Sequence, residues 1–197
     1  YILALYMGEA KGSISDEYYK KIISELKSTP GKLQAVLDRK GEVEALANIF
    51  YSRNDIFFIG RGLDSCVSYE GSLKLKEVSY INSLAITAGE LKHGTIALVE
   101  DDTLIFALAS QDFLFEKMLS NIEEVKTRGA RVVGIAKKNQ NAIQSKADEV
   151  IFIPDCADEI TPLLTVVPLQ LFAYYVAKRR GTNVDKPKNL AKSVTVE

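Results

Sequence analysis

Three charged side chains recur at helical spacing in the middle of the chain. Glu70, Lys74 and Glu77 are separated by four and three residues, and Ile81 follows four further on. A helix would therefore place all four on one face. Next to a strand end, burial would raise the pKa of a carboxylate and suit it to proton transfer. The same spacing is typical of a solvated stripe, in which a Glu–Lys pair contributes only about 0.3–0.5 kcal/mol. Taken alone, the pattern favours the stripe.

His93 is the second candidate, because it is the only histidine in the chain. It lies between Lys92 and Gly94 in the segment AGELKHGTIALVE, which we expect to form a short helical turn over the strand ends. An imidazole titrates near neutral pH and can serve in acid–base chemistry. A lone histidine is more often structural or simply exposed, so the signal from spacing is weak.

The third candidate is Lys192, in the C-terminal segment DKPKNLAKSVTVE. A lysine amine attacks a ketone to form a Schiff base when desolvation or neighbouring charge lowers its pKa. Val194 and Val196 could anchor the tail to the domain and enclose the lysine. The alternative is an ordinary frayed end. The tail alone does not decide between the two.

Five short apolar runs predict the strands that must position these residues. Helical patterns at 67–82 and 113–128 alternate with them, the second with Gly129 as its expected C-cap. This alternation predicts a parallel sheet covered on both faces. Ligands of such sheets bind beyond the carboxyl ends of the strands, here at the turn 60–62 and the loops after Thr87 and Leu108. The predicted strands are 56–60, 83–87, 103–108, 131–136 and 149–153.

The segments near the two ends of the chain are expected to be helical. Helices are expected at 16–25 after the N-cap Ser15, at 32–38 after Pro30, and at 43–51. The chain opens at Tyr1 inside an apolar helical pattern without the charged start of a signal peptide, and we expect it to be cut from something longer. The apolar run 162–177 is shorter than the roughly 20 residues of a membrane helix and contains Pro168, so a buried helix and no membrane contact are expected.

Composition excludes some partners. The chain has 25 Lys and Arg against 26 Asp and Glu, a net charge of −1, which gives no electrostatic case for nucleic acid or an anionic membrane. Cys66 and Cys156 match no metal-binding spacing, so no metal is expected and a reducing, cytoplasmic location is favoured.

Several long stretches together resemble the glutamine–fructose-6-phosphate aminotransferase family. The segments KLKEVSYINSLAITAGELKHGTIALVEDD and VDKPKNLAKSVTVE are similar to the C-terminal half of its isomerase region, as are SNIEEVKTRGA and VVPLQLFAYYVA. The resemblance covers essentially the whole chain. It implies an α/β fold of the sugar-isomerase (SIS) type, a flavodoxin-like three-layer sandwich with a five-stranded parallel sheet and no cofactor. It divides the chain into connector helices (1–42), an SIS subdomain (43–181) and a catalytic tail (182–197).

The resemblance also implies roles in converting fructose 6-phosphate and glutamine-derived ammonia into glucosamine 6-phosphate. Lys192 matches the lysine that forms a Schiff base at C2, and Glu77 the carboxylate that moves a proton between C1 and C2. His93 matches a ring-opening histidine that acts in the neighbouring subunit, which implies a homodimer. Lys74 and Glu70 match polar groups beside the carboxylate. Glu70 and Ala191 are expected to contact substrate.

Two features depart from the family pattern. The resemblance implies a preceding glutaminase domain and a first SIS subdomain, which the 197 residues do not include, and the second of these carries the serine-rich loops that hold the sugar phosphate. The matching loop here, LASQDFLFEK, has Ser110 and Gln111 without a Ser-Gly-Glu-Thr continuation. Arg61, in the turn 60–62, and Ser65 could form a weak anion nest. We therefore expect a degenerate phosphate site, with Arg61 as a candidate substrate contact.

A second function class stays open. SIS domains also serve as non-catalytic sensors of sugar phosphates, and such a module has no need for a Schiff-base lysine. Lys192 and His93 favour the enzyme, although the fragment by itself is expected to be inactive.

Overall fold

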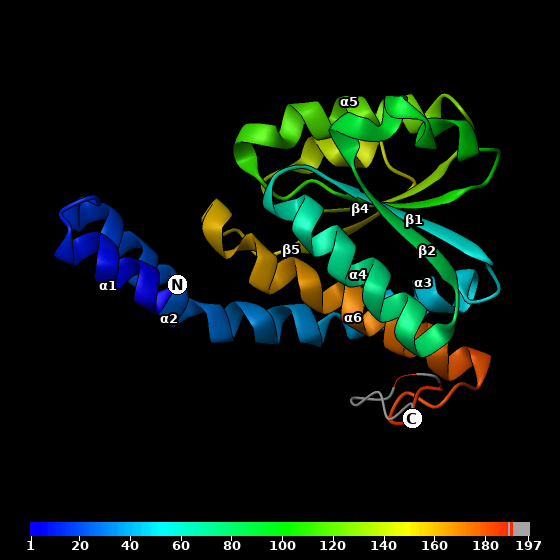
Figure 1. Ribbon diagram of the computed structural model, residues 1–197, viewed down its shortest axis with the longest axis horizontal. Coiled ribbons are helices and arrows are strands. Elements are labelled where there is room, and N and C mark those ends of the chain that lie inside the picture. The colour runs from blue at the N-terminus through cyan, green and yellow to red at the C-terminus, as the bar shows by residue number, and fades with distance from the viewer. Residues whose placement is uncertain (189, 191–197) are drawn as a thin grey trace, which may run out of the picture.

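The fold is built on a five-stranded sheet in which every strand pair is parallel. A computed structural model describes residues 1–188 and 190. The strand order is β2-β1-β3-β4-β5, so the chain reverses its direction of travel across the sheet between β1 and β3. This order is the flavodoxin-like one, and the predicted sheet is confirmed to within a residue at each strand end (Figure 1). The strands are β1 (Asp55–Gly60), β2 (Asn82–Thr87), β3 (Leu104–Leu108), β4 (Arg131–Lys137) and β5 (Glu149–Ile153).

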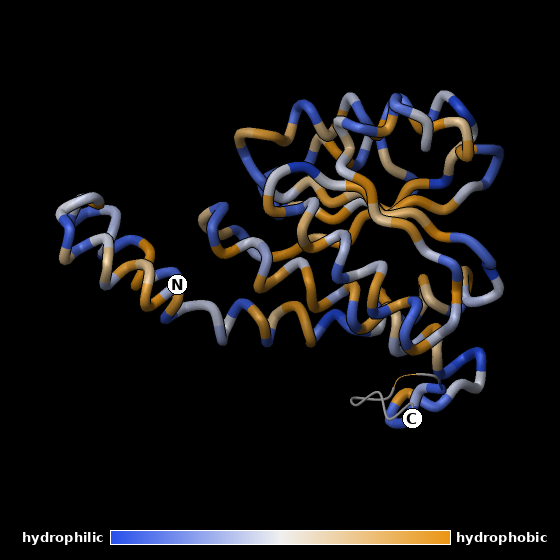
Figure 2. Tube along the Cα trace, viewed as in Figure 1, coloured by the Kyte–Doolittle hydropathy of each residue, from blue (hydrophilic) through white to orange (hydrophobic). Residues whose placement is uncertain are grey.

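Helices cover both faces of the sheet because its strands are apolar on both sides (Figure 2). On one face, α3 (Lys40–Phe50), α4 (Leu63–Ser79) and α6 (Thr161–Arg180) pack together. Phe106 joins α6 to this layer, since its ring lies 5.2 Å from that of Phe58 and 4.6 Å from that of Phe172. On the other face, α5 (Phe115–Lys126) covers a second cluster around Ile105 and Val132.

The connection between β2 and β3 contains only the 3-10 helices η1 (Ala88–His93) and η2 (Thr95–Leu98). The expected short helical turn around His93 is therefore confirmed. Three further 3-10 turns lie in loops: η3 (Asp112–Leu114), η4 (Asn141–Ser145) and η5 (Asp158–Ile160).

The N-terminal helices correct one prediction. After α1 (Ile2–Ala10), α2 runs without a break over Asp16–Asp38, so the expected interruption at Pro30 is wrong. Proline removes one helical hydrogen bond. Burial of Ile22, Thr29 and Val36, spaced seven apart on one face, offsets this loss. The N-cap is confirmed, because the Ser15 hydroxyl accepts the backbone N–H of Tyr18. In Figure 1, α1 and the start of α2 extend away from the sheet.

The boundaries of several helices also differ from expectation. α4 begins at Leu63, four residues before the predicted start, and ends at Ser79 because Tyr80 adopts a left-handed conformation (φ 61°). α5 ends at Lys126 rather than 128, because the backbone N–H groups of Arg128 and Gly129 close tighter three-residue turns.

α6 is confirmed as a core helix. By length and composition alone, the helical segment 158–180 is long and apolar enough to cross a membrane. However, 61% of its apolar window is buried within the protein, and α6 packs against α3 and α4. This burial is typical of a core helix that packs between other helices and one face of a sheet.

Candidate functional site

The charged face of α4 forms as predicted. Lys74 Nζ lies 2.6 Å from Glu77 Oε2 and 3.7 Å from Glu70 Oε1, and the three side chains are 26–40% exposed. The hydrogen bond to Glu77 is the main cause that raises the pKa of Lys74, although partial burial opposes it. Lys74 is therefore held as an ammonium ion, which makes it a charge partner for the carboxylates and a poor nucleophile.

His93 lies at the far end of the sheet from this face. α4 returns from the carboxyl end of β1 to the amino end of β2, so Glu77 lies just before β2, while His93 follows it. A six-residue strand spans about 20 Å. The His93 ring is 73% exposed, and its Nδ1 lies 2.7 Å from Glu90 Oε2. His93 and Glu77 of one chain are therefore not brought together.

Arg61 belongs to a polar network that supports the turn around His93. Its Nε donates to Asn121 Oδ1 (2.9 Å), and the Asn121 amide donates to Glu124 (3.2 Å). Glu124 in turn pairs with Lys92 at 2.8 Å, and this bond is the main cause that lowers its pKa. Gly89 gives Arg61 room, because a Cβ there would lie 3.3 Å from the guanidinium. The network ties the turn after β1 to α5 and η1.

The switch point between β1 and β3 is occupied by the chain's own polar groups. Asp64 is 1% exposed and accepts both the backbone N–H (2.7 Å) and the hydroxyl (2.6 Å) of Ser110. Gln111 Oε1 accepts the N–H of Leu63 at the start of α4 (2.8 Å). The Ser65 hydroxyl bonds to that of Thr87 (2.9 Å). Of the groups expected to form an anion nest, the Ser65 hydroxyl and the Arg61 side chain thus have partners within the chain.

Asp64 was missed by the sequence reasoning, although a carboxylate directly after a strand–turn junction was a usable signal. Burial raises its pKa to about 6, while the bonds from Ser110 lower it. Since the usual value is 3.8, the native chain binds this proton more tightly than the unfolded chain. Stability from Asp64 is then fully present below about pH 4 and is lost as the pH rises through about 6.

Asp64→Asn removes this titration. Between pH 4 and 7 the free energy of unfolding of the unsubstituted protein should fall relative to that of the variant, by up to about 3 kcal/mol. Urea unfolding of both proteins at several pH values measures the difference. The exposed Asp16→Asn removes one carboxylate at the surface and provides a matched control. A difference between Asp64→Asn and the unsubstituted protein that stays constant with pH would contradict the assignment.

A second buried charge was also missed. Lys137 is 1% exposed at the carboxyl end of β4, and its Nζ lies 2.8 Å from both Asp112 and Asp158. No sequence pattern pointed to it, because Asp112 and Asp158 are distant along the chain. Two carboxylates compensate one ammonium here, which is a structural arrangement that fixes the loops after β3 and β5.

The tail residues Lys192, Ala191, Val194 and Val196 lie outside the described residues. The chain just before them is tied to the end of α4. The backbone N–H of Lys188 donates to the Tyr80 hydroxyl (2.8 Å), and its Nζ lies 4.4 Å from the centre of the Tyr80 ring. Tyr80 directly follows α4, so the tail starts close to the helix that carries Glu77.

Comparison with known proteins shows which family the chain matches. The SIS domain family matches residues 49–178. The chain is 58% identical over all 197 residues to a glutamine–fructose-6-phosphate aminotransferase (isomerizing) of Caldanaerobacter subterraneus, and 50% identical to one of Clostridium tetani. In each case it spans only 32% of the relative's length.

Two solved structures have folds similar to that of this chain. The C-terminal domain of glucosamine-fructose-6-phosphate aminotransferase from Francisella tularensis aligns with a TM-score of 0.87 and 34% identity, over 94% of this chain and 52% of that one. The sugar isomerase domain of an RpiR transcription factor from Sphaerobacter thermophilus aligns with a TM-score of 0.68 over 81% of this chain and 90% of that one. At 15% identity, this second similarity concerns the fold alone.

Proposed function

We propose a role for this chain from the premise that it belongs to the SIS domain family. The chain supplies isomerase residues to a larger enzyme that makes glucosamine 6-phosphate from fructose 6-phosphate and glutamine-derived ammonia. The observation that carries the proposal is the Lys74–Glu77 ion pair at 2.6 Å on α4, beside the start of the tail. It stands in a chain that is 58% identical over its full length to a glutamine–fructose-6-phosphate aminotransferase.

Each residue has a distinct role in this proposal. The Lys192 amine attacks C2 of the open-chain ketose, and the carbonyl oxygen leaves as water to give an imine. Ammonia then adds to C2 and displaces the Lys192 amine, which leaves the imine of ammonia at C2. Glu77 takes a proton from C1 and returns it to C2 to give the amino aldose, while Lys74 stays charged beside it. Glu70 and Ala191 contact the substrate beside α4, whereas Arg61 lies with His93 at the other end of the sheet and acts through the turn that it supports.

His93 acts in the active site of a neighbouring subunit. Two observations support this role. The length of β2 separates His93 from Glu77 of the same chain, and the His93 ring is 73% exposed and can therefore meet a second subunit. A two-fold dimer would carry each His93 to the partner's α4. The partner subunit is thus part of the site.

The rest of the enzyme supplies what this chain lacks. We propose a first SIS subdomain whose hydroxyl-rich loops bind the sugar phosphate, and a glutaminase domain that releases ammonia. Two observations support this proposal. The polar groups at the switch point already have internal partners, and α4 exposes Tyr69 and Leu73 beside its charged face. We also propose a cytoplasmic location, because both cysteines of the chain, Cys66 and Cys156, are free thiols.

Assay of the full-length protein separates an enzyme from a sensor of sugar phosphates. With fructose 6-phosphate and ammonium chloride, which replaces the glutaminase, the enzyme should form glucosamine 6-phosphate. A sensor would bind fructose 6-phosphate without turnover, and this outcome would refute the proposal.

The chain of 197 residues alone should self-associate and yet turn over little fructose 6-phosphate. Association follows from the shared site, and low activity follows because binding energy from the remote phosphate orients the reacting carbons. Light scattering and a coupled assay for glucose 6-phosphate measure the two properties. A strict monomer would refute the first, and turnover close to that of the intact enzyme would refute the second.

A further inference from the structure

The turn that carries His93 has three stripes of side chains, because a 3-10 helix has three residues per turn and its residues i and i+3 eclipse. One stripe of η1, Ala88 and Leu91, is 1% exposed and belongs to the apolar cluster that α5 covers. Another stripe, Glu90 and His93, is largely exposed. Among the residues that the structure describes, only Glu90 bonds to the His93 ring, so the place of the ring depends on the orientation of η1.

The remaining stripe, Gly89 and Lys92, meets a polar network that is centred on Asn121 of α5. Asn121 Oδ1 accepts from Arg61 Nε (2.9 Å), and the guanidinium lies against Gly89, where an added Cβ would be 3.3 Å away. The Asn121 amide donates to Glu124 (3.2 Å), whose other carboxylate oxygen pairs with Lys92 (2.8 Å). One side chain on α5 therefore reaches both positions of this stripe.

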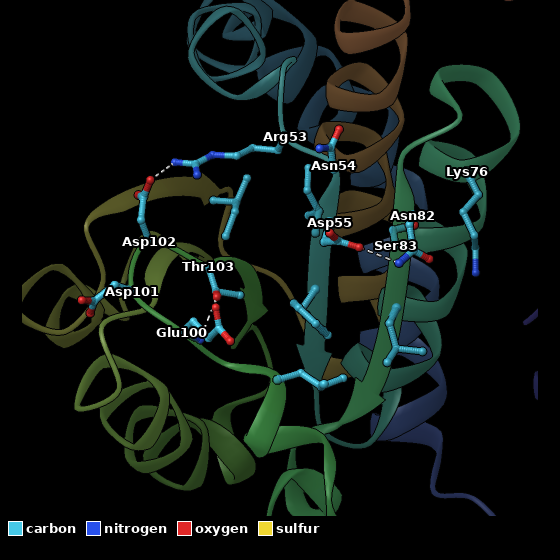
Figure 3. Close-up of a pocket in the computed structure, with 15 residues that line it drawn as sticks. Arg53, Asn54, Asp55, Lys76, Asn82, Ser83, Glu100, Asp101, Asp102 and Thr103 are labelled. Carbon is cyan, nitrogen blue, oxygen red and sulfur yellow. Dashed lines mark hydrogen bonds and ion pairs between the residues drawn. The ribbon is translucent and has the colours of Figure 1, made fainter.

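The β2–β3 connection has no helix on its other side. A parallel strand pair usually has a crossover helix, but here the connection contains only η1 and η2. An open groove of 740 Å³ is left at the amino ends of β1, β2 and β3, lined in part by Leu84 and Leu98 (Figure 3). Apart from β2 and η2, its neighbours in the sequence, η1 packs mainly against α5. The support of η1 from outside its own segment thus comes from α5.

Asn121 is suited to hold the turn in one orientation. It is 5% exposed, and both ends of its amide have partners. Apolar contacts such as those of Ala88 and Leu91 are not directional, so alone they would let η1 rotate. A buried polar network whose members are satisfied favours one arrangement.

We propose that Asn121 is a positioning residue, which fixes the direction in which η1 presents His93 to the neighbouring subunit. It acts through its bonds to Arg61 and Glu124 and touches no substrate. The inference rests on the role proposed above for His93. A general acid or base must lie within hydrogen-bond reach of the proton that it moves, and a misplacement of about 1 Å can cost on the order of 10²-fold in rate.

Asn121→Ala in the full-length enzyme should lower kcat for glucosamine 6-phosphate formation by about tenfold or more. KM for fructose 6-phosphate should change by less than about twofold, because the sugar phosphate is bound elsewhere. Glu124→Ala removes one arm of the network and should lower kcat in the same direction. Glu123→Ala is the matched control, since it removes an ion pair between α5 and Lys146, away from η1, and should leave kcat unchanged.

A double-mutant cycle separates positioning from general damage. Because the sugar ring also opens spontaneously in water, His93→Ala should lower kcat and still leave a measurable rate. Adding Asn121→Ala to His93→Ala should then lower kcat no further, since the side chain that Asn121 positions is already absent. A merely structural loss would lower kcat by the same factor in both backgrounds, and this result would overturn the proposal.

Amide hydrogen exchange in the full-length enzyme tests the support of η1 without activity. Asn121→Ala should speed exchange of the segment 88–98 by about tenfold or more and leave β1 and β4 as protected as before. Unchanged exchange at 88–98 would also refute the proposal. If Asn121→Ala does not fold, the partly exposed Glu124→Ala takes its place in the cycle and in the exchange measurement.

The two proposals fail in different ways. Normal activity of His93→Ala would refute the role proposed for His93 itself. Reduced activity of His93→Ala together with full activity of Asn121→Ala would refute only the positioning by Asn121.

Discussion

Lys192→Arg in the full-length enzyme is expected to lower glucosamine 6-phosphate formation by on the order of 10³-fold or more. Arginine keeps the positive charge but cannot lose its proton to become a nucleophile. Lys74 is a poor replacement, because its hydrogen bond to Glu77 holds it in its charged form. Lys186→Arg makes the same exchange six residues earlier in the sequence and should leave activity unchanged.

Borohydride trapping identifies the covalent residue directly. Reduction in the presence of fructose 6-phosphate should attach the sugar to Lys192, located by peptide mapping. The label should be absent from Lys192→Arg and present in Lys186→Arg. A label on Lys74 or Lys92 would refute the assignment, even if the variant were inactive.

The sheet was predictable from sequence because its strands are buried on both faces. Runs such as IFFIG are apolar at every position, and the surrounding glycines and polar residues mark their ends. α2 was less predictable, since Pro30 predicts a break from local chemistry alone. Its continuity depends on Ile22, Thr29 and Val36 packing against the rest of the chain, which local sequence does not express.

The candidate site was likewise predictable only where it depends on local sequence. The spacing of Glu70, Lys74 and Glu77 correctly predicted a shared face, because helical geometry is local. The residue that bonds to the Asp64 carboxylate and the carboxylates that pair with Lys137 are 46 and at least 21 residues away, so only the fold could reveal them.

Glu77→Gln in the full-length enzyme is expected to slow exchange of the C1 proton with solvent by about 10²–10⁴-fold, the usual contribution of a general acid–base group. The amide is almost the same size as the carboxylate but cannot accept a proton. Sugar-phosphate binding should be nearly intact, because the phosphate is held elsewhere. The effect therefore falls on the chemical step, so turnover drops while the dissociation constant of fructose 6-phosphate changes little.

Deuterium incorporation at C1, followed by proton NMR in D₂O, isolates this step from the glutaminase reaction. Glu116→Gln, an exposed carboxylate on α5, makes the same chemical change away from α4 and should exchange normally. Because Lys74 bonds to Glu77 at 2.6 Å, the variant also leaves that ammonium beside a neutral amide. If the variant lost both sugar binding and proton exchange, Glu77 would organise the site through Lys74. Exchange at the normal rate would mean that another residue is the base, and the role proposed for the charged face of α4 would be wrong.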